Sequence, residues 1–370
     1  MVPLFDLTRQ YQTLKPELDA AVLRVLESGQ FVLGPNVENF EKNAAQFLGV
    51  KHAIGVANGT DALLLSLRAL GVKAGDEVIT TPFSFIATAE VVSLLGATPV
   101  FVDIQSDTFN IDPQKIEAAI TPRTKGIIPV HLFGHPAEMR AIQTFADAHD
   151  LFVLEDAAQA WGAFVNDSAI SSTRYCGALA KMGAFSFFPS KNLGAAGEGG
   201  LVTTDDDALA KHVKVLRMHG MKRRYYHDEI GYNSRLHALQ AAILDVKLPY
   251  SSQWNDARRA HAAHYRELLS DLPIWLPTEK AYCHHVYHQY TIRTERRAEL
   301  IEKLNASQIG NAIYYPVPLH QQTVYSCLGY GEGSLPEAEA ASREVLSLPI
   351  FPELRAEEIE EVARVVRSVL

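Results

Sequence analysis

Lys191 is the residue of this sequence with the clearest chemical potential. It follows an apolar run, 183–188, that is typical of a buried strand, and it precedes a turn rich in glycine. A lysine in this place is either a solvated loop residue or a buried amine that has lost its water. In the second case its pKa falls, because burial disfavours the ammonium form, and the neutral amine becomes a nucleophile. The other residues at strand ends must decide between the two interpretations.

An anion site is predicted after the apolar strand 52–58. Gly59 lies at the start of a predicted helix, 60–70, whose first residues Thr60 and Asp61 favour a helix N-terminus. Free N–H groups and the helix dipole attract anions there, Gly59 allows close approach, and Thr60 adds a hydroxyl. An ordinary capped helix has the same residues. A dinucleotide or P-loop site has less support, because the sequence lacks G-x-G-x-x-G after this strand and lacks G-x-x-x-x-G-K-[ST] altogether.

Polar side chains also mark the ends of two later strands. Glu155 and Asp156 follow four apolar residues at the end of one strand, where a carboxylate is costly unless it is paired. Asp156 either caps a helix or holds a protonated ring nitrogen of a ligand, and Gln159, about one turn further, can bond the same ligand. Ser186 lies in the strand that precedes Lys191. In open α/β sheets, ligands bind at the carboxyl ends of the strands, so we expect these side chains to share one site.

Pyridoxal 5′-phosphate (PLP) is a cofactor that needs all of these groups at once. Its phosphate binds amides and hydroxyls, its ring nitrogen needs an anion, and its aldehyde needs a lysine. Phe83 and Phe85 follow another predicted strand and offer a flat face against which the ring can stack. Each signal is weak alone, but the ordered set predicts a PLP site around Lys191.

The elements that position these groups alternate along the first two thirds of the chain. Apolar strands separated by helix-length segments predict an α/β fold with a mainly parallel sheet covered on both faces. Amphipathic helices dominate later, which predicts a large domain, 1–248, and a smaller α+β domain, 249–370. The predicted strands are 52–58, 76–82, 98–104, 125–134, 151–156, 183–188, 199–204 and 284–293, and the predicted helices are 60–70, 87–96, 248–269, 296–310 and 357–370.

Composition and charge exclude several other classes of function. The 370 residues carry a formal net charge of −9 and no long basic run, so we expect no nucleic-acid partner. The densest basic stretch, 221–226, is either a solvated loop or a site for an anionic ligand. Three scattered cysteines favour the cytoplasm over a disulfide framework. The N-terminus lacks the pattern of a signal peptide, and no apolar run is long enough to span a membrane.

With these residues in hand, the sequence resembles the DegT/DnrJ/EryC1/StrS family of nucleotide-sugar aminotransferases. The resemblance covers nearly the whole chain and implies the aspartate aminotransferase fold (type I), with a large PLP domain and a small C-terminal domain. It rests on the segments 28–41, 55–63, 75–89, 127–134, 155–163, 186–200, 231–242 and 346–352.

The resemblance implies a role for each candidate residue of the cofactor site. Lys191 is then the Schiff-base lysine, Asp156 pairs with the ring nitrogen, and Gln159 contacts the ring from its hydroxyl side. Asn233 matches a residue that contacts the phosphate of the neighbouring subunit, which implies a homodimer with shared sites. The other implied contacts are Gly59, Thr60 and Ser186 at the phosphate, Phe85 against the ring, and Arg235, Tyr314, Tyr315 and His320 at the substrate.

The reaction implied is a ping-pong transfer in amino-sugar biosynthesis. An amino donor, expected to be glutamate, gives its amine to the cofactor, and the amine then passes to a keto group of a nucleotide-linked sugar. Lys191 acts as general base and acid in both halves. Dehydratases of the family carry histidine at this position, so Lys191 favours transamination. Segments 2–11, 28–35 and 219–235 are more similar to members that act on 3-keto sugars than on 4-keto sugars.

Two alternative functions stay open at this point. In the first, the substrate is a cyclitol or another cyclic ketone. In the second, the chain is a binding or regulatory protein that keeps the fold without catalysis. The intact set of Lys191, Asp156 and Gln159 argues against the second. The histidine-rich segment 283–290 resembles a metal site, but its alternation favours a structural strand, and we predict no metal.

Overall fold

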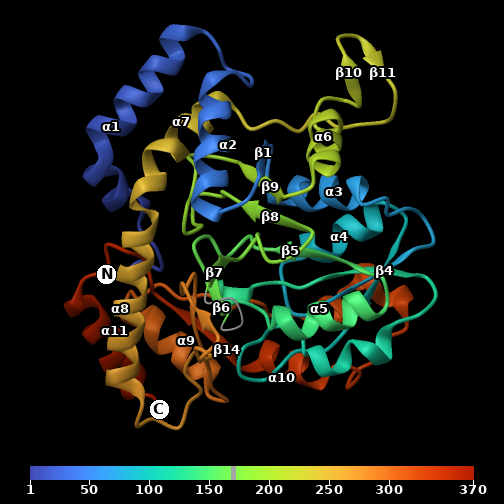
Figure 1. Ribbon diagram of the computed structural model, residues 1–370. Helices are drawn as coiled ribbons and strands as arrows, with labels where there is room; N and C mark the ends of the chain where they lie inside the picture. The colour runs from blue at the N-terminus through green and yellow to red at the C-terminus, as the bar shows by residue number, and fades with distance from the viewer. Residues whose placement is uncertain (168–171) are drawn as a thin grey trace.

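A seven-stranded sheet forms the centre of the computed structural model, which describes residues 1–167 and 172–370 (Figure 1). Its strands follow the order β1 (His52–Val56), β9 (Gly200–Thr204), β8 (Met182–Ser186), β5 (Phe152–Asp156), β4 (Thr124–Ile128), β2 (Glu77–Thr80) and β3 (Thr98–Phe101). Neighbours from β8 to β3 are parallel, whereas β9 runs antiparallel to β8 and to β1. The predicted α/β fold with a mainly parallel sheet is confirmed.

Helices cover both faces of this sheet. Successive side chains of a strand point to opposite faces, so Ala184 of β8 packs in one apolar cluster and Phe185 in another. Both faces are therefore apolar, which is why the strands are continuous apolar runs in the sequence. The helices are α3 (Gly59–Ala69), α4 (Ala87–Leu94) and α6 (Asp207–Leu216) on one face, and α2 (Pro35–Leu48), α5 (Met139–Ala148) and α7 (Ala238–Lys247) on the other.

The C-terminal third has an apolar core of its own. Tyr265, Tyr290 and Leu346 are fully buried in it, together with residues of the last helix. A second cluster joins the two parts of the chain, because it contains both Phe83 and Tyr325. The division at residue 248 stays a prediction. The elements of this part are α8 (Ser251–Leu269), α9 (Arg297–Ala306), α10 (Pro336–Glu344) and α11 (Ala356–Arg367), with the antiparallel pair β13 (Tyr290–Arg293) and β14 (Val345–Leu348).

Three further elements lie outside the main sheet. Helix α1 (Leu7–Ser28) packs along α7 (Figure 1). A three-stranded sheet contains β6 (Phe164–Asp167), β7 (Ser172–Tyr175) and β12 (Cys283–His284). The hairpin of β10 (Met221–Arg223) and β11 (Tyr226–His227) projects from the body of the molecule next to α6 (Figure 1). No helix within the described ranges is long and apolar enough to cross a membrane.

Two details of the predicted elements were wrong. The predicted strand 284–293 is two short strands, β12 and β13, that belong to different sheets. Between them the chain bonds to a loop of the large sheet, and Tyr287 has a positive φ of 44° that breaks the extended backbone. The first helix begins one residue earlier than predicted, at Gly59, because Asn58 caps it by accepting a hydrogen bond from the N–H of Asp61 at 2.8 Å.

Candidate active site

Lys191 lies on a tight turn that leaves the end of β8. Its N–H donates to the carbonyl of Phe188 at 2.8 Å, and the N–H of Ala195 returns to the carbonyl of Phe187 at 2.8 Å. A Cβ on Gly194 would lie 2.3 Å from the carbonyl oxygen of Pro189, so the turn closes only with glycine there. Burial lowers the pKa of Lys191 to about 8, against the opposing effect of the Asp156 carboxylate. Lys191 is half-buried at the end of this turn, and its role as the reactive amine stays a prediction.

Asp156 ends β5 as a buried carboxylate. Its Oδ2 accepts a hydrogen bond from the Thr88 hydroxyl at 2.8 Å, and its Oδ1 accepts the N–H of Ala158 at 3.2 Å. Burial raises the pKa of Asp156, while Thr88, Ala158 and Lys191 act in the opposite direction. No Lys or Arg among the described residues forms a salt bridge with it, so the carboxylate fits a cationic ring nitrogen. Thr88 was missed from the sequence, because a threonine in the first turn of α4 has no local pattern that distinguishes it from the other polar residues of this helix, Glu90 and Ser93.

Gln159 and Tyr315, from distant parts of the chain, meet at this edge of the sheet. The Phe133 N–H donates to Oε1 of Gln159 at 2.6 Å, and Nε2 of Gln159 donates to the Tyr315 hydroxyl at 3.1 Å. These bonds fix the orientation of the amide. Burial raises the pKa of Tyr315, so its phenol is neutral. One predicted cofactor contact and one predicted substrate contact are therefore neighbours.

Gly59 and Ser186 meet where the predicted phosphate would bind. A Cβ on Gly59 would lie 2.6 Å from the Cβ of Ser186, so only glycine permits this approach. Gly59 and Thr60 are the first two residues of α3, where the N–H groups lack helical partners. The Ser186 Oγ accepts the N–H of Phe188 at 3.3 Å and keeps its own hydrogen free to donate. This set of donors fits a phosphate.

The side chains of Phe85 and His320 differ widely in solvent exposure. The Phe85 ring is 59% exposed and forms an open face, as a stacking surface requires. His320 is 1% exposed, and its Nε2 lies 3.1 Å from a carboxylate oxygen of Glu339. Its Nδ1 is buried and has no hydrogen-bond partner among the residues that the structure describes. A substrate reaches His320 only if the loop around it moves, so the predicted contact remains a prediction.

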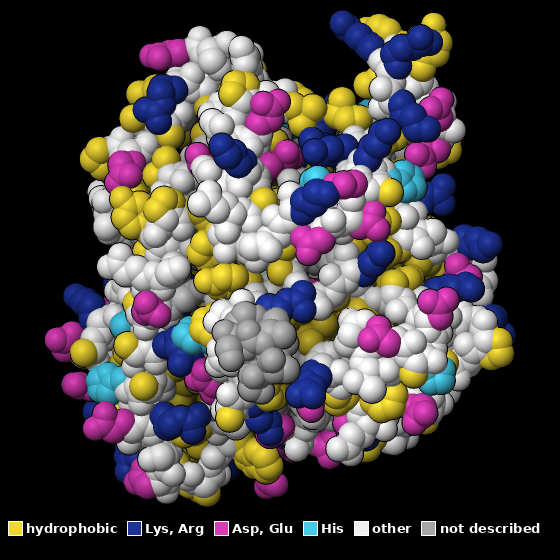
Figure 2. Space-filling model, viewed as in Figure 1, with side chains coloured by type: hydrophobic (Ala, Val, Ile, Leu, Met, Phe, Trp, Pro, Cys, Tyr) yellow, Lys and Arg dark blue, Asp and Glu magenta, His cyan; other side chains and the backbone are white. Residues whose placement is uncertain are grey.

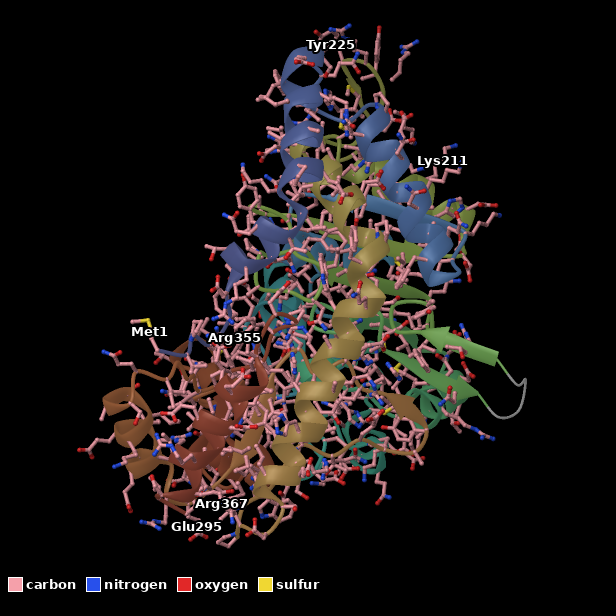
Figure 3. The ribbon with its side chains drawn as sticks, turned by 90° about the vertical axis from the view of Figure 1, so that its left-hand side faces the viewer. Met1, Lys211, Tyr225, Glu295, Arg355 and Arg367 are labelled. Carbon is pink, nitrogen blue, oxygen red and sulfur yellow. The ribbon has the colours of Figure 1, made fainter. Side chains whose placement is uncertain are left out.

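The residues predicted to reach a second subunit lie on the surface. Asn233 is exposed, and its Oδ1 accepts a hydrogen bond from the guanidinium of Arg235. They follow the β10–β11 hairpin, on which Lys and Arg side chains gather (Figure 2). The Arg223 guanidinium stacks 3.6 Å from the centre of the Tyr226 ring. Tyr225 is 77% exposed at the tip, at the opposite end of the molecule from Glu295 and Arg367 (Figure 3).

One group of potential metal ligands occurs in the described part of the chain: His131, Glu155 and Cys176. The donor atoms of His131 and Glu155 already have partners. Glu155 accepts the N–H groups of Gly177, Leu179 and Ala180 at 2.7 to 2.9 Å and lies 2.9 Å from Nε2 of His131. The other ring nitrogen of His131 accepts the N–H of Ala137 at 3.0 Å. These hydrogen bonds, next to Asp156 in the chain, account for the closeness of His131 and Glu155 without a metal.

The fold and the site define a PLP-dependent aminotransferase. The model of the DegT/DnrJ/EryC1/StrS aminotransferase family matches residues 12–367, and the chain belongs to this family. Solved structures of family relatives hold the pyridoxamine form of the cofactor.

Particular relatives match over nearly their whole length. A protein of Geobacillus stearothermophilus named pleiotropic regulatory protein is 49% identical, over 99% of both chains. UDP-N-acetyl-3-dehydro-alpha-D-glucosamine 3-aminotransferase of Acidithiobacillus ferrooxidans is 46% identical, over 100% of this chain and 98% of the relative. The structure of S. venezuelae DesV in complex with a ketimine intermediate has a TM-score of 0.96 and 46% identity, over 99% and 98% of the two chains.

Proposed function

We propose that this aminotransferase moves an amino group from glutamate to the 3-keto group of a nucleotide-linked sugar. The observation that carries the proposal is that Lys191, with a pKa lowered by burial, lies at one sheet edge with the buried Asp156 carboxylate and the close approach of Gly59 to Ser186. The preference for a 3-keto sugar is supported by relatives whose names specify it. The cytoplasm is the proposed compartment, in keeping with cysteines that are all free.

Each of the chain's own residues has a defined task in this proposal. PLP supplies an electron sink, which stabilises the negative charge formed when the donor loses its α-proton. Asp156 holds the ring nitrogen in its protonated form, and Gln159 orients the ring from the side. The Lys191 amine, neutral in a large share of molecules near pH 8, takes a proton at one carbon and returns it at another. Gly59, Thr60 and Ser186 hold the phosphate, and Phe85 covers the ring. Tyr314 and Tyr315 form the sugar side, and His320 joins them once the loop around it moves.

A homodimer completes the proposed site. Asn233 is exposed and Arg235 is half-buried. The hairpin beside them exposes the large rings of Tyr225 and Tyr226, and such exposed aromatic surface is typical of an interface. We assign Asn233 to the phosphate of the partner subunit and Arg235 to its sugar substrate. This assignment is tested by mixing the Lys191→Ala variant with the double variant Asn233→Ala, Arg235→Ala and measuring the activity of the mixture. Shared sites predict that mixed dimers recover activity that both parents lack, whereas separate sites predict no recovery.

Two other functions can be examined in one test. A regulatory role is supported by the name of the Geobacillus relative, and a cyclitol or another cyclic ketone is the alternative substrate. The enzyme is loaded with PLP, converted with glutamate, and offered 3-keto nucleotide sugars, 4-keto nucleotide sugars and cyclic ketones. Return of the original visible absorption with 3-keto sugars alone supports the proposal. Return of the absorption with 4-keto sugars or cyclic ketones would assign the enzyme to that substrate class instead. An absorption that does not respond to glutamate favours the regulatory role.

A further inference from the structure

A short segment of the C-terminal part, Val286 to His288, lies between two loops of the active site. On one side, the Val286 N–H donates to the carbonyl of Gly134 at 3.1 Å, and the His288 N–H donates to the carbonyl of Phe133 at 2.8 Å. On the other side, the Asn192 amide donates to the carbonyl of Val286 at 3.2 Å. The segment therefore links the loop after β4 to the turn that carries Lys191.

Gly134 permits this close approach. Its φ of 92° is a conformation that other residues rarely adopt. A Cβ there would lie 2.8 Å from Cγ2 of Val286 and 3.1 Å from the backbone nitrogen of His288. The contact is thus built into the backbone, and it explains why this stretch is not the continuous strand that its alternation predicts.

Asn192 determines which ring nitrogen of His288 carries the hydrogen. Both hydrogens of its amide are used, because Nδ2 donates to Oδ1 of Asn255 at 2.7 Å and to the carbonyl of Val286. Asn255 is oriented in turn by its bond to the carbonyl of Trp161 at 2.9 Å. Oδ1 of Asn192 lies 3.0 Å from Nδ1 of His288 and can only accept. The hydrogen of the neutral imidazole is therefore on Nδ1.

These bonds join two groups of the cofactor site. Phe133 accepts the N–H of His288 and donates its own N–H to Gln159 at 2.6 Å. A continuous path runs from Gln159 through Phe133 and His288 to Asn192, the neighbour of Lys191. Asn192 and His288 are each 4% exposed, so water does not compete for the bonds. Burial, with Lys191 and Arg258 adding to it, holds the pKa of His288 well below its usual range, which keeps the ring neutral.

We propose that His288 and Asn192 are positioning residues that set the placement of Lys191 relative to Gln159 and the cofactor ring. The inference rests on the proposed function, since it requires Lys191 to move protons at a fixed distance from the ring. Neither residue is assigned a contact with the substrate. Their loss therefore lowers the rate of proton transfer and leaves substrate affinity almost unchanged.

The test compares His288→Leu with His288→Asn, whose amide N–H replaces Nδ1–H. We expect His288→Leu to slow the glutamate half-reaction by about 10- to 100-fold, the size of a small misplacement of reacting groups, with KM changed less than about twofold. His288→Asn recovers most of this rate. The pH midpoint of the bound cofactor's visible absorption moves in His288→Leu and returns in His288→Asn. The control His284→Asn, in the same stretch but stacked on Phe164, behaves like the wild type.

A second measurement needs no activity. Nitrogen-15 NMR of the cofactor-free wild type is expected to show His288 with hydrogen on Nδ1, and Asn192→Ala is expected to lose this single form. If His288→Leu does not fold, Asn192→Asp replaces it, because it keeps the acceptor for His288 and loses both donors. Hydrogen on Nε2, or an unchanged rate and pH midpoint in His288→Leu, overturns the inference. A wild type that fails to react with glutamate instead overturns the proposed function.

Discussion

The two halves of the proposed active site differ in how complete they are within one chain. At the ends of β5 and β8, Asp156 and Gln159 are buried and held by hydrogen bonds from residues far away in the sequence. On the opposite side of the proposed site, Asn233 and Arg235 are held mainly by each other on the surface. The half proposed to carry the chemistry is preformed by the fold, whereas the half proposed to contact the partner subunit and the sugar lies at the surface. Changes in the first half should affect catalysis, and changes in the second should affect sugar binding.

The largest expected effect is that of Lys191→Ala in the preformed half. Loss of the amine that acts as general base and acid should lower turnover by about 10²- to 10⁴-fold or more. Borohydride reduction of the PLP-loaded wild type, followed by mass spectrometry of its peptides, should place the cofactor on Lys191. Attachment to another lysine would show that the preformed half has been assigned wrongly.

The next largest effect is expected from Asp156→Asn. A neutral amide cannot hold the ring nitrogen protonated, so the glutamate half-reaction should slow by about 10²-fold or more. Thr88→Val removes the hydroxyl that donates to Asp156 and should slow the same half-reaction by less than about tenfold. Stopped-flow absorption checks both variants. Equal rates in Asp156→Asn and the wild type would show that the Asp156 carboxylate does not act on the ring nitrogen.

Gly59→Ala should weaken cofactor binding more than it slows catalysis. The added methyl meets Ser186 at 2.6 Å and pushes apart the two sides of the phosphate cradle. We expect a rise in the Kd of PLP of about tenfold, a cost of about 1.4 kcal/mol. Equilibrium dialysis measures it. Gly71→Ala is a control on the same domain, since a Cβ there has no atom within 4 Å, although its φ of 84° strains any side chain. Equal affinity in both variants would argue against the cradle.

The exposed half is tested by Arg223→Ala with Arg224→Ala. If these guanidiniums attract a diphosphate or a uronate, their loss should raise the KM of the sugar by about tenfold and leave the glutamate half-reaction unchanged. Steady-state kinetics for the sugar and single-turnover kinetics for glutamate separate the two effects. A slower glutamate step would show that the hairpin supports the preformed half as well.

A further effect, again of about tenfold, is expected in the pH dependence of cofactor capture. A lysine whose pKa is lowered to about 8 is mostly protonated at pH 7 and mostly neutral at pH 9. Capture of PLP by the cofactor-free protein should therefore accelerate with a midpoint near pH 8, by about tenfold over this range. Because the folded pKa lies below that of the unfolded chain, Lys191 also becomes less destabilising as pH rises above 8. A midpoint near 10.5 would mean that the amine is solvated.

The sequence predicts the preformed half well and the contacts between distant segments poorly. Strands buried on both faces leave continuous apolar runs, so Asp156 and Lys191 could be placed at strand ends from local pattern alone. The bonds of Thr88 to Asp156 and of Tyr315 to Gln159 join residues far apart in the chain, and no local pattern encodes them. The alternation in 284–293 was misleading, because the positive φ of Tyr287 and the bonds to Phe133 and Gly134 divide it.

The visible absorption of the PLP-loaded wild type, recorded before and after glutamate, tests the central claim most directly. The account predicts a yellow enzyme whose absorption bleaches with glutamate and returns with a 3-keto nucleotide sugar. Lys191→Ala should lack the initial band. An enzyme that binds PLP but neither bleaches with glutamate nor recovers its colour with any keto sugar would contradict the account.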